Sequence, residues 1–329
     1  MKRLLSFLFL FVLTTNYAQL TNIPDSYFEA YLEANGMGNG IANDHLVTTA
    51  NINGVITLDV SNLNISDLTG IEDFSNLTNL HCEQNELENL NISANTGLTT
   101  LYCYANNLSA IDVSNNVALK FFYCNSNNIG SLDLSTNTAL LTLECSFNNL
   151  ISLDLSTNVS IDYLDCGAND ITSLDLTNNY YLTHMYCYNN LLTTIDLRNF
   201  NNQYLTYFSS QSNPNLTCIY VDQVAWCQEN WTDIDLHTNI VADETACTVG
   251  VQSFINTSYF SLSPNPTKDS FKIKSQEIIT DITIFNVLGK EVNKFSKQAS
   301  YSVSNLSKGV YLVRVRTKKG VGTKKLLIE

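Results

Sequence analysis

A column of carboxylates is the first feature of this chain that could do chemistry. Aspartates recur at a step of 21 residues, and Asn91 precedes them at the same step. Stacked carboxylates repel one another, so they must be hydrated, hydrogen-bonded to turn donors, or bridged by cations such as calcium. The spacing of a calcium loop with its bidentate Glu is absent, which favours solvated or turn-capping acids over a metal site. The weak metal candidates are Asp112, Asp133, Asp154, Asp175 and Asp196.

Cysteines follow the same 21-residue step, and nine of them would indicate a disulfide framework if the chain is exported. Six occupy one repeated position, where the side chains of a parallel stack point the same way. Buried thiols fit this geometry better than disulfides or a metal site. Among the other three we prefer a Cys218–Cys247 bridge, which leaves Cys227 over. The six repeated positions are Cys82, Cys103, Cys124, Cys145, Cys166 and Cys187.

Catalytic constellations are absent from the sequence. His45, His81, His184 and His237 are scattered, and no Gly-x-Ser-x-Gly, His-Glu-x-x-His or phosphate-cradling loop occurs. We therefore expect neither an enzymatic activity nor a cofactor.

A repeat must position these residues. The segment 98–108 fits the frame LxxLxLxxNxL, and its Leu101 and Cys103 alternate with Tyr102 and Tyr104, as in a short strand with one buried face. One such strand cannot bury its apolar face, but coils stacked roughly 4.8 Å apart form a continuous core. We expect the repeated asparagine amides to form a structural ladder that satisfies backbone groups of the turns. They are Asn85, Asn106, Asn127, Asn148, Asn169 and Asn190.

This pattern resembles the leucine-rich-repeat family, in a short bacterial variant with units reading LxxLxCxxNxLxxLDLSxNxx. The likeness spans residues 55–220 and implies a mainly β solenoid with a parallel strand stack. Solenoid ends require caps. We expect an N-terminal cap over 19–54, with a helix over 22–35, and a C-terminal cap over 221–249.

Charge and hydropathy separate a leader, an acidic body and a basic tail. Lys2 and Arg3 precede ten largely apolar residues, which predicts a signal peptide over 1–18, too short to span a bilayer. Residues 19–260 contain two basic and 26 acidic residues, a net charge of −24, whereas 261–329 carry +8. So acidic a body repels nucleic acid and anionic membranes. No further segment is long and apolar enough to span a membrane.

The basic tail has its own pattern of strands. After a linker at 250–260, alternating β-branched and aromatic residues predict a small antiparallel β-sandwich of about seven strands. Segments 264–266, 286–289 and 309–311 resemble the type A sorting domain of the type IX secretion system over 261–329. The resemblance implies export through the periplasm to the surface or the medium, by contact with the type IX machinery. Such tails are usually removed, often with attachment to a surface glycolipid.

The outward strand positions of the repeats are where binding can reside. They form one patch of aromatics with acids among them, and rigid aromatics are over-represented at interfaces. The alternative is that aromatic columns merely support strand stacking. Our leading hypothesis is a module that binds a protein or glycan, and the other is a calcium-bridged structural or matrix protein. The predicted ligand face is Tyr102, Tyr104, Phe121, Tyr123, Glu144, Tyr163, Asp165, Tyr186 and Tyr188.

Overall fold

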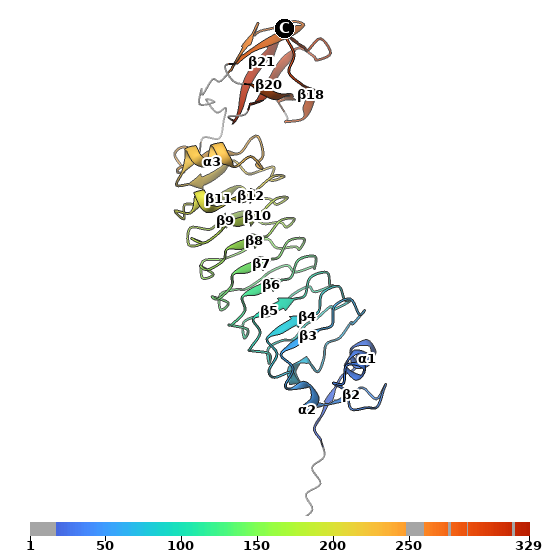
Figure 1. The fold of residues 1–329 in the computed structure, drawn as a ribbon. Coiled ribbons are helices and arrows are strands. Elements are labelled where there is room, and N and C mark those ends of the chain that lie inside the picture. The colour runs from blue at the N-terminus through green and yellow to red at the C-terminus, as the bar shows by residue number, and fades with distance from the viewer. Residues whose placement is uncertain (1–17, 248–259, 276–277, 288, 318–319) are drawn as a thin grey trace, which may run out of the picture. The chain divides into compact units, whose positions relative to one another are not determined.

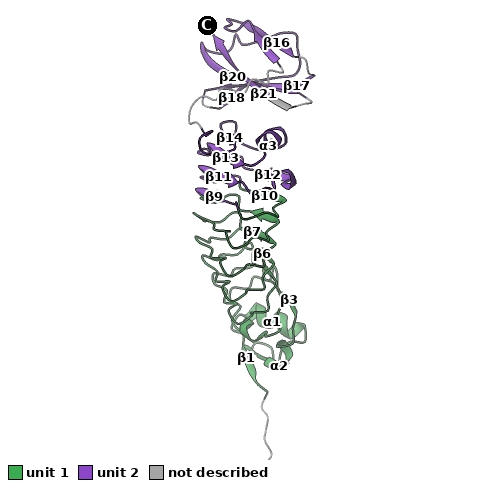
Figure 2. Cartoon of the chain, turned by 90° about the vertical axis from the view of Figure 1, so that its left-hand side faces the viewer, with its two compact units in different colours: residues 1–171, 178–187 green, residues 172–177, 188–329 purple. Residues whose placement is uncertain are grey.

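The computed structural model describes residues 18–247, 260–275, 278–287, 289–317 and 320–329. The predicted signal peptide, apart from Ala18, and most of the predicted linker lie outside the described residues. The chain divides into two compact units (Figure 2): unit 1 is Met1–Ile171 with Asn178–Cys187, and unit 2 is Thr172–Thr177 with Tyr188–Glu329. The fold is mainly β, which confirms the predicted class.

Unit 1 is built on short parallel strands, one to a coil. They pair in the order β10-β8-β7-β6-β5-β4-β3, each stacked on its neighbour (Figure 1). The central residue of each strand points into the core, and Leu58, Leu101 and Met185 are fully buried examples. The predicted solenoid is thereby confirmed. Its strands are β3 (Thr57–Asp59), β4 (Asn79–His81), β5 (Thr100–Tyr102), β6 (Phe121–Tyr123), β7 (Thr142–Glu144), β8 (Tyr163–Asp165) and β10 (His184–Tyr186).

The repeated cysteines lie inside the coils. All six are buried thiols rather than disulfides, as the stacking argument predicted. Burial raises the pKa of each thiol, so these groups stay protonated at neutral pH. The Cys82 thiol donates to the carbonyl of Tyr102, 3.4 Å away. Their position within the coil gives them a packing role.

The repeated asparagines connect each coil to the preceding one. Asn127 Nδ2 donates to the Cys103 carbonyl of the preceding coil (3.0 Å) and to the Cys124 carbonyl of its own coil (3.1 Å). Its Oδ1 accepts from the Leu108 N–H at 3.0 Å. One buried side chain thus satisfies backbone groups of two coils. The same bridging pattern recurs at Asn85, Asn106, Asn148 and Asn169.

A second column of buried asparagines, not predicted from the sequence, lies in the other half of the coils. Asn137 Nδ2 donates to the carbonyls of Val113 (3.0 Å) and Asn116 (2.9 Å) in the preceding coil. Two asparagine columns therefore join the coils. The second consists of Asn95, Asn116, Asn137, Asn158 and Asn179.

The residue before each ladder asparagine has left-handed backbone. Its φ lies between 52° and 57° in six successive coils, although none of these residues is glycine. Left-handed backbone brings Cβ close to the following carbonyl in any residue other than glycine. The turn is therefore held in place by the hydrogen bonds around it. The positions are Gln84, Ala105, Ser126, Phe147, Ala168 and Asn189.

The N-terminal part of unit 1 combines helices with a small sheet. The helix α1 (Ser26–Ala34) is shorter than the predicted 22–35 because the Asp25 carboxylate caps it, accepting from the N–H groups of Tyr27 (2.9 Å) and Phe28 (3.0 Å). Pro24 therefore precedes the helix. The other elements are the antiparallel pair β1 (Leu20–Asn22) and β2 (Leu46–Thr48), α2 (Thr49–Ile52) and the 3₁₀ turn η1 (Ile71–Asp73).

The repeat end of unit 2 is a parallel sheet in the order β14-β13-β11-β9. A disulfide joins Cys218 to Cys247, as predicted, with the two Cα atoms 6.0 Å apart, and Cys227 is a buried thiol. The indole of Trp231 donates to the Leu205 carbonyl at 3.2 Å. The elements are β9 (Ser173–Asp175), β11 (Thr194–Leu197), η2 (Asn202–Tyr204), β12 (Tyr207–Ser209), β13 (Cys218–Val221), α3 (Val224–Asn230) and β14 (Asn239–Val241).

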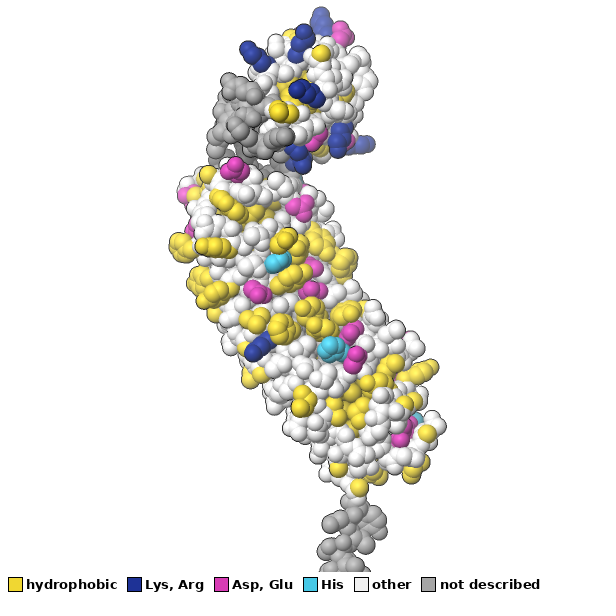
Figure 3. Space-filling view, in the orientation of Figure 1, with side chains coloured by type: hydrophobic (Ala, Val, Ile, Leu, Met, Phe, Trp, Pro, Cys, Tyr) yellow, Lys and Arg dark blue, Asp and Glu magenta, His cyan; other side chains and the backbone are white. Residues whose placement is uncertain are grey.

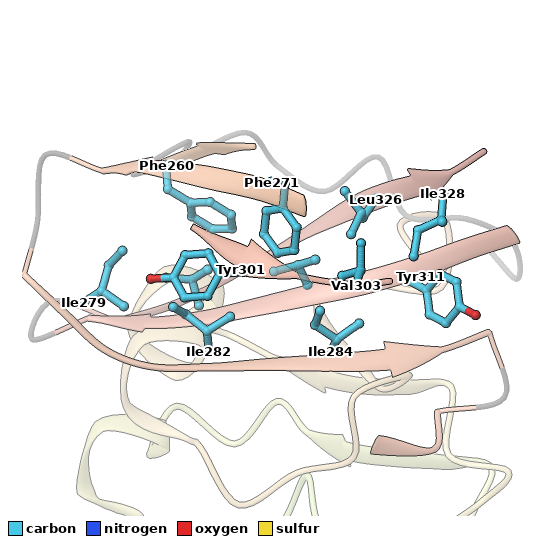
Figure 4. Close-up of a cluster of buried hydrophobic side chains, with 12 residues drawn as sticks. Phe260, Phe271, Ile279, Ile282, Ile284, Tyr301, Val303, Tyr311, Leu326 and Ile328 are labelled. Carbon is cyan, nitrogen blue, oxygen red and sulfur yellow. The ribbon is translucent and has the colours of Figure 1, made fainter. Parts of the chain in front are cut away.

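The C-terminal residues form two antiparallel sheets, as predicted. Their orders are β15-β16-β19 and β18-β17-β20-β21. Figure 4 shows Phe271, Tyr301 and Ile282 among the side chains of their shared core. The strands are β15 (Phe260–Ser263), β16 (Ser270–Ser275), β17 (Ile279–Asn286), β18 (Glu291–Phe295), β19 (Tyr301–Ser302), β20 (Gly309–Thr317) and β21 (Gly320–Ile328).

Replacing a residue of left-handed backbone by glycine should stabilise the protein. We expect Ala105→Gly to raise the free energy of unfolding by about 1 kcal/mol, because glycine adopts positive φ without a Cβ clash. Ala139→Gly is the matched control: its φ is not positive, so it should lose about 0.5–1 kcal/mol through the greater entropy of the unfolded chain. Urea unfolding measures both. Equal losses would show that the left-handed turn is not strained.

Candidate functional site

The outward side chains of unit 1 form ordered rows across its parallel strands. The in-register pairing aligns His81, Tyr102, Tyr123, Glu144, Asp165 and Tyr186 in one row. A parallel row holds Asn79, Thr100, Phe121, Thr142, Tyr163 and His184. Two residues beyond the first row, the alternation continues through Glu83, Tyr104, Asn125 and Ser146. We call these three rows the strand face.

Aromatic rings on the strand face gather in two clusters. In the first, the Tyr102 ring contacts His81 (4.5 Å between centroids), Tyr123 (4.4 Å, edge-on) and Tyr104 (6.5 Å). This preference for tilted and edge-on contact follows from the ring quadrupole.

The second cluster is centred on Tyr163. Its ring stacks on His184 at 5.5 Å and contacts Tyr186 at 5.9 Å. The single patch predicted from the sequence is therefore two clusters, because the β7 positions between them carry Thr142 and Glu144.

The predicted aromatics are only partly accessible. Phe121 is 37% exposed, while the tyrosines of both clusters are half-buried. The rings cover one another, so aromatic stacking accounts for part of their recurrence from coil to coil. Their remaining exposed edges are still available to a ligand. Tyr188, also half-buried, belongs to unit 2.

Two carboxylates sit side by side between the clusters. Glu144 and Asp165 are register partners on β7 and β8. Burial, then the neighbouring Asp165 charge, raises the pKa of Glu144, and burial raises that of Asp165. Asp165 Oδ1 accepts from the Gly167 N–H at 3.0 Å, and the neighbouring Tyr163 side chain partly offsets the rise in the pKa of Glu144. Local groups thus stabilise the pair in part, but its charge is not neutralised.

Glu83 continues the outward alternation of its strand and is not among the predicted ligand-face residues. Its side chain is 9% exposed, and its Oε2 is buried without a hydrogen-bond partner. Burial raises the pKa of Glu83. The alternation of the sequence continues beyond the strand, and this signal could have placed Glu83 in the predicted ligand face. The burial of its carboxylate could not be predicted, because it depends on side chains of the neighbouring coils.

The hydroxyls of Tyr123 and Tyr163 on the strand face remain protonated donors. Burial, followed by nearby charges and phenols, raises the pKa of Tyr123 and of Tyr163 to about 12. The face therefore combines rings, neutral hydroxyls and carboxylates. Figure 3 shows apolar side chains on the repeats with acidic and His side chains among them, while Lys and Arg gather on the C-terminal domain.

The aspartate column caps turns. The Oδ1 atoms of Asp112, Asp133 and Asp154 each accept an N–H from the residue two positions on, at 2.9 Å. Asp175 and Asp196 in unit 2 accept in the same way, at 3.0 and 3.1 Å. The side chains and N–H groups of Ser114, Ser135 and Ser156 lower the pKa of the first three carboxyls. Across the described ranges, His, Cys, Asp and Glu form no group of three or more able to hold a metal.

Comparison with known proteins finds a family for the C-terminal residues and structures of similar fold for the repeats. Residues 261–329 match the family described as secretion system C-terminal sorting domain. Internalin C2 from Listeria monocytogenes is 21% identical with a TM-score of 0.50, over 68% of this chain and 98% of that one. InlJ of the same organism, whose functional domain is described as including a cysteine ladder, is 18% identical with a TM-score of 0.27, over 96% and 100%. No curated protein matches.

The fold and this likeness show a solenoid of parallel strands like that of internalin C2. The chain also carries a type IX secretion sorting domain, which directs it to the cell surface or the medium. None of the helices that the structure describes is long and apolar enough to cross a bilayer.

The stability of the protein should respond to the Glu144 charge with a defined sign. Because the pKa of Glu144 is raised by folding, the folded chain holds its proton more tightly. Stability therefore rises as pH falls through the folded pKa and levels off below the unfolded one. We expect Glu144→Gln to raise Tm at about pH 7 and to converge with the parent near pH 3, below the ordinary Glu pKa.

Asp133→Asn is the matched control for this charge removal. In the parent protein, the Ser135 hydrogen bonds lower the pKa of the folded Asp133 carboxyl. Asp133 therefore contributes stability that is present above the unfolded pKa and is lost as pH falls through the folded pKa. The Tm of the variant should fall at neutral pH. Circular dichroism melts across this pH range measure both variants, and a lower Tm for Glu144→Gln at neutral pH would contradict the assignment.

Proposed function

We propose that this protein is an exported binding module that holds a protein or glycan ligand on the strand face of its repeats and performs no catalysis. The observation that carries the proposal is the pair of ring clusters around Tyr102 and Tyr163, with the Glu144 and Asp165 carboxylates between them. Stacked rings are rigid, so a ligand that covers them orders few side chains.

The chemistry of the face supports ligand binding over a purely structural role. Stacking of the strands could explain the aromatic rings by itself. It gives no reason for three carboxylates to lie among those rings. Burial already penalises the charges of Glu83, Glu144 and Asp165. A partner that offers hydrogen-bond donors offsets this penalty.

A calcium-bridged matrix role receives less support. The Asp112, Asp133 and Asp154 carboxylates already accept hydrogen bonds from their own turns.

The sorting domain adds one further partner, the type IX machinery, which we propose recognises residues 261–329. We propose that removal of this tail follows export.

Truncation of the rings tests the proposed function. The probe is a combined array of glycans and proteins, and the sample is the full chain. We expect a triple variant to weaken capture of any ligand by at least about tenfold, because rigid aromatics commonly dominate interface energies. The variant replaces Tyr102, Tyr123 and Tyr186 together by Ala.

Tyr27, Tyr180 and Tyr181 replaced together by Ala form the matched control. These tyrosines are exposed and lie outside the strand face, so capture should be unchanged. A folded face variant that retains full capture would remove the hypothesis.

A further inference from the structure

Three carboxylates on the strand face form no ion pair with Lys or Arg in the part of the chain that the structure describes. Within the ranges that the structure describes, no Lys or Arg nitrogen lies within 4.0 Å of Glu83, Glu144 or Asp165. The acidic body surrounding them has a net charge of −24 over residues 19–260. The face is therefore complementary to a cation that the repeats do not supply.

Two buried acceptors on the same row point to a missing donor. Glu83 is more than nine-tenths buried, and its Oε2 makes no hydrogen bond. Asn125, at the same repeat position two coils on, has a buried Oδ1 that also makes none. Oδ1 atoms of the second asparagine column also make no hydrogen bond, but they lie inside the coils, whereas Glu83 and Asn125 belong to the strand face. Each acceptor there has given up water without a replacement.

Tyr104 lies between these groups. It occupies the repeat position between Glu83 and Asn125, and the charges of Glu83 and Glu144 both contribute to raising its pKa. Its ring contacts Tyr102, which contacts Tyr123 in turn. A continuous aromatic platform therefore separates Glu83 from the Glu144–Asp165 pair.

We propose that the strand face holds an extended peptide with two basic side chains, one bound by Glu83 and one by Glu144 and Asp165, across the platform of Tyr102, Tyr104 and Tyr123. The inference rests on the proposed function and names the ligand class for the same face. Arginine suits both positions best, because its guanidinium donates in a fork to carboxylates and stacks on rings.

The repeat sets the spacing of the two basic residues. Glu83 and Glu144 lie three coils apart, about 14 Å across the strands, and Glu83 lies two residues, about 7 Å, farther along its coil, so the two positions are about 16 Å apart. An extended chain advances about 3.4 Å per residue, so about five residues cover that distance. The expected motif is a basic residue, four small residues and a second basic residue.

Charge favours a peptide over a neutral glycan. Sugar hydroxyls could donate to Glu83 Oε2 and Asn125 Oδ1, but they would leave all three carboxylate charges in a partly desolvated surface. Two guanidinium groups supply donors and also compensate charge. A glycan that uses the same face is therefore an outcome that the test must detect.

Fluorescence anisotropy with labelled peptides and the full chain tests the inference. The probe is Arg-Gly-Ser-Gly-Ser-Arg, and its isomer Arg-Arg-Gly-Ser-Gly-Ser has the same charge with adjacent basic residues. We expect the spaced peptide to bind about tenfold more tightly than the isomer, which corresponds to one engaged charge contact. The glutamate analogue should not bind.

Charge-neutral variants locate the contacts. Glu83→Gln and Glu144→Gln should each weaken the spaced peptide about tenfold, whereas Asp133→Asn, which removes one carboxylate from the turn column, should not. Glu83→Gln should also raise Tm, because it removes a buried charge. Reduced binding in a more stable variant cannot be attributed to unfolding.

Several results would overturn the inference. Equal affinity for both peptide isomers, or an equal loss in Asp133→Asn, would show attraction to net charge alone. Full affinity in both Gln variants would exclude the assigned carboxylates. Capture of a neutral oligosaccharide that depends on the tyrosines but not on Glu83 or Glu144 would retain the proposed function and reject the peptide. If neither the tyrosine variant nor the two Gln variants lost capture, the proposed function and the peptide inference would both be rejected.

Discussion

The asparagine amide that bridges consecutive coils is the interaction on which the rest of unit 1 depends. Each turn leaves backbone groups inside the solenoid that water cannot reach, and an unpaired group there costs about 1–3 kcal/mol. Asn127 satisfies groups of its own coil and of the coil before it with one planar side chain. The same geometry then imposes one spacing and one register on every coil.

That fixed register explains the strand face. Residues 21 positions apart become nearest neighbours, so any property that recurs with the repeat becomes a column of contacts. Tyrosines placed this way stack. Acids placed this way are held beside one another, as at Glu144 and Asp165, despite their repulsion. The ladder opposes this repulsion, and a ligand that neutralises it would bind a surface already in position.

The inward pattern could be read from the sequence because it depends on local period. Alternation at Leu101 and Cys103, with an asparagine three residues later, was sufficient to predict strand, core and ladder. The start of α1 was predicted less well because Asp25, not Pro24, caps the helix. The pairing of Cys218 with Cys247 agreed with prediction.

The binding surface was harder to predict because it depends on neighbours across coils. Exposure of a tyrosine is set by the ring beside it, so one predicted patch became two half-buried clusters. The burial of Glu83 and its unpaired oxygen cannot be inferred from a single repeat unit. The second asparagine column was missed for a different reason: its 21-residue recurrence was visible at Asn137 and Asn158, but no strand marks that half of the coil there.

The most direct measurement compares two adjacent asparagines by urea unfolding. Asn127 is buried in the ladder, whereas Asn128 is exposed and no hydrogen bond involves its side chain. The account predicts that Asn127→Ala loses about 3 kcal/mol of unfolding free energy, since donors and acceptors of two coils lose their partner, and that Asn128→Ala changes it by less than about 0.5 kcal/mol. Equal, small losses at both positions would contradict the view that the amide ladder sets the register of the coils.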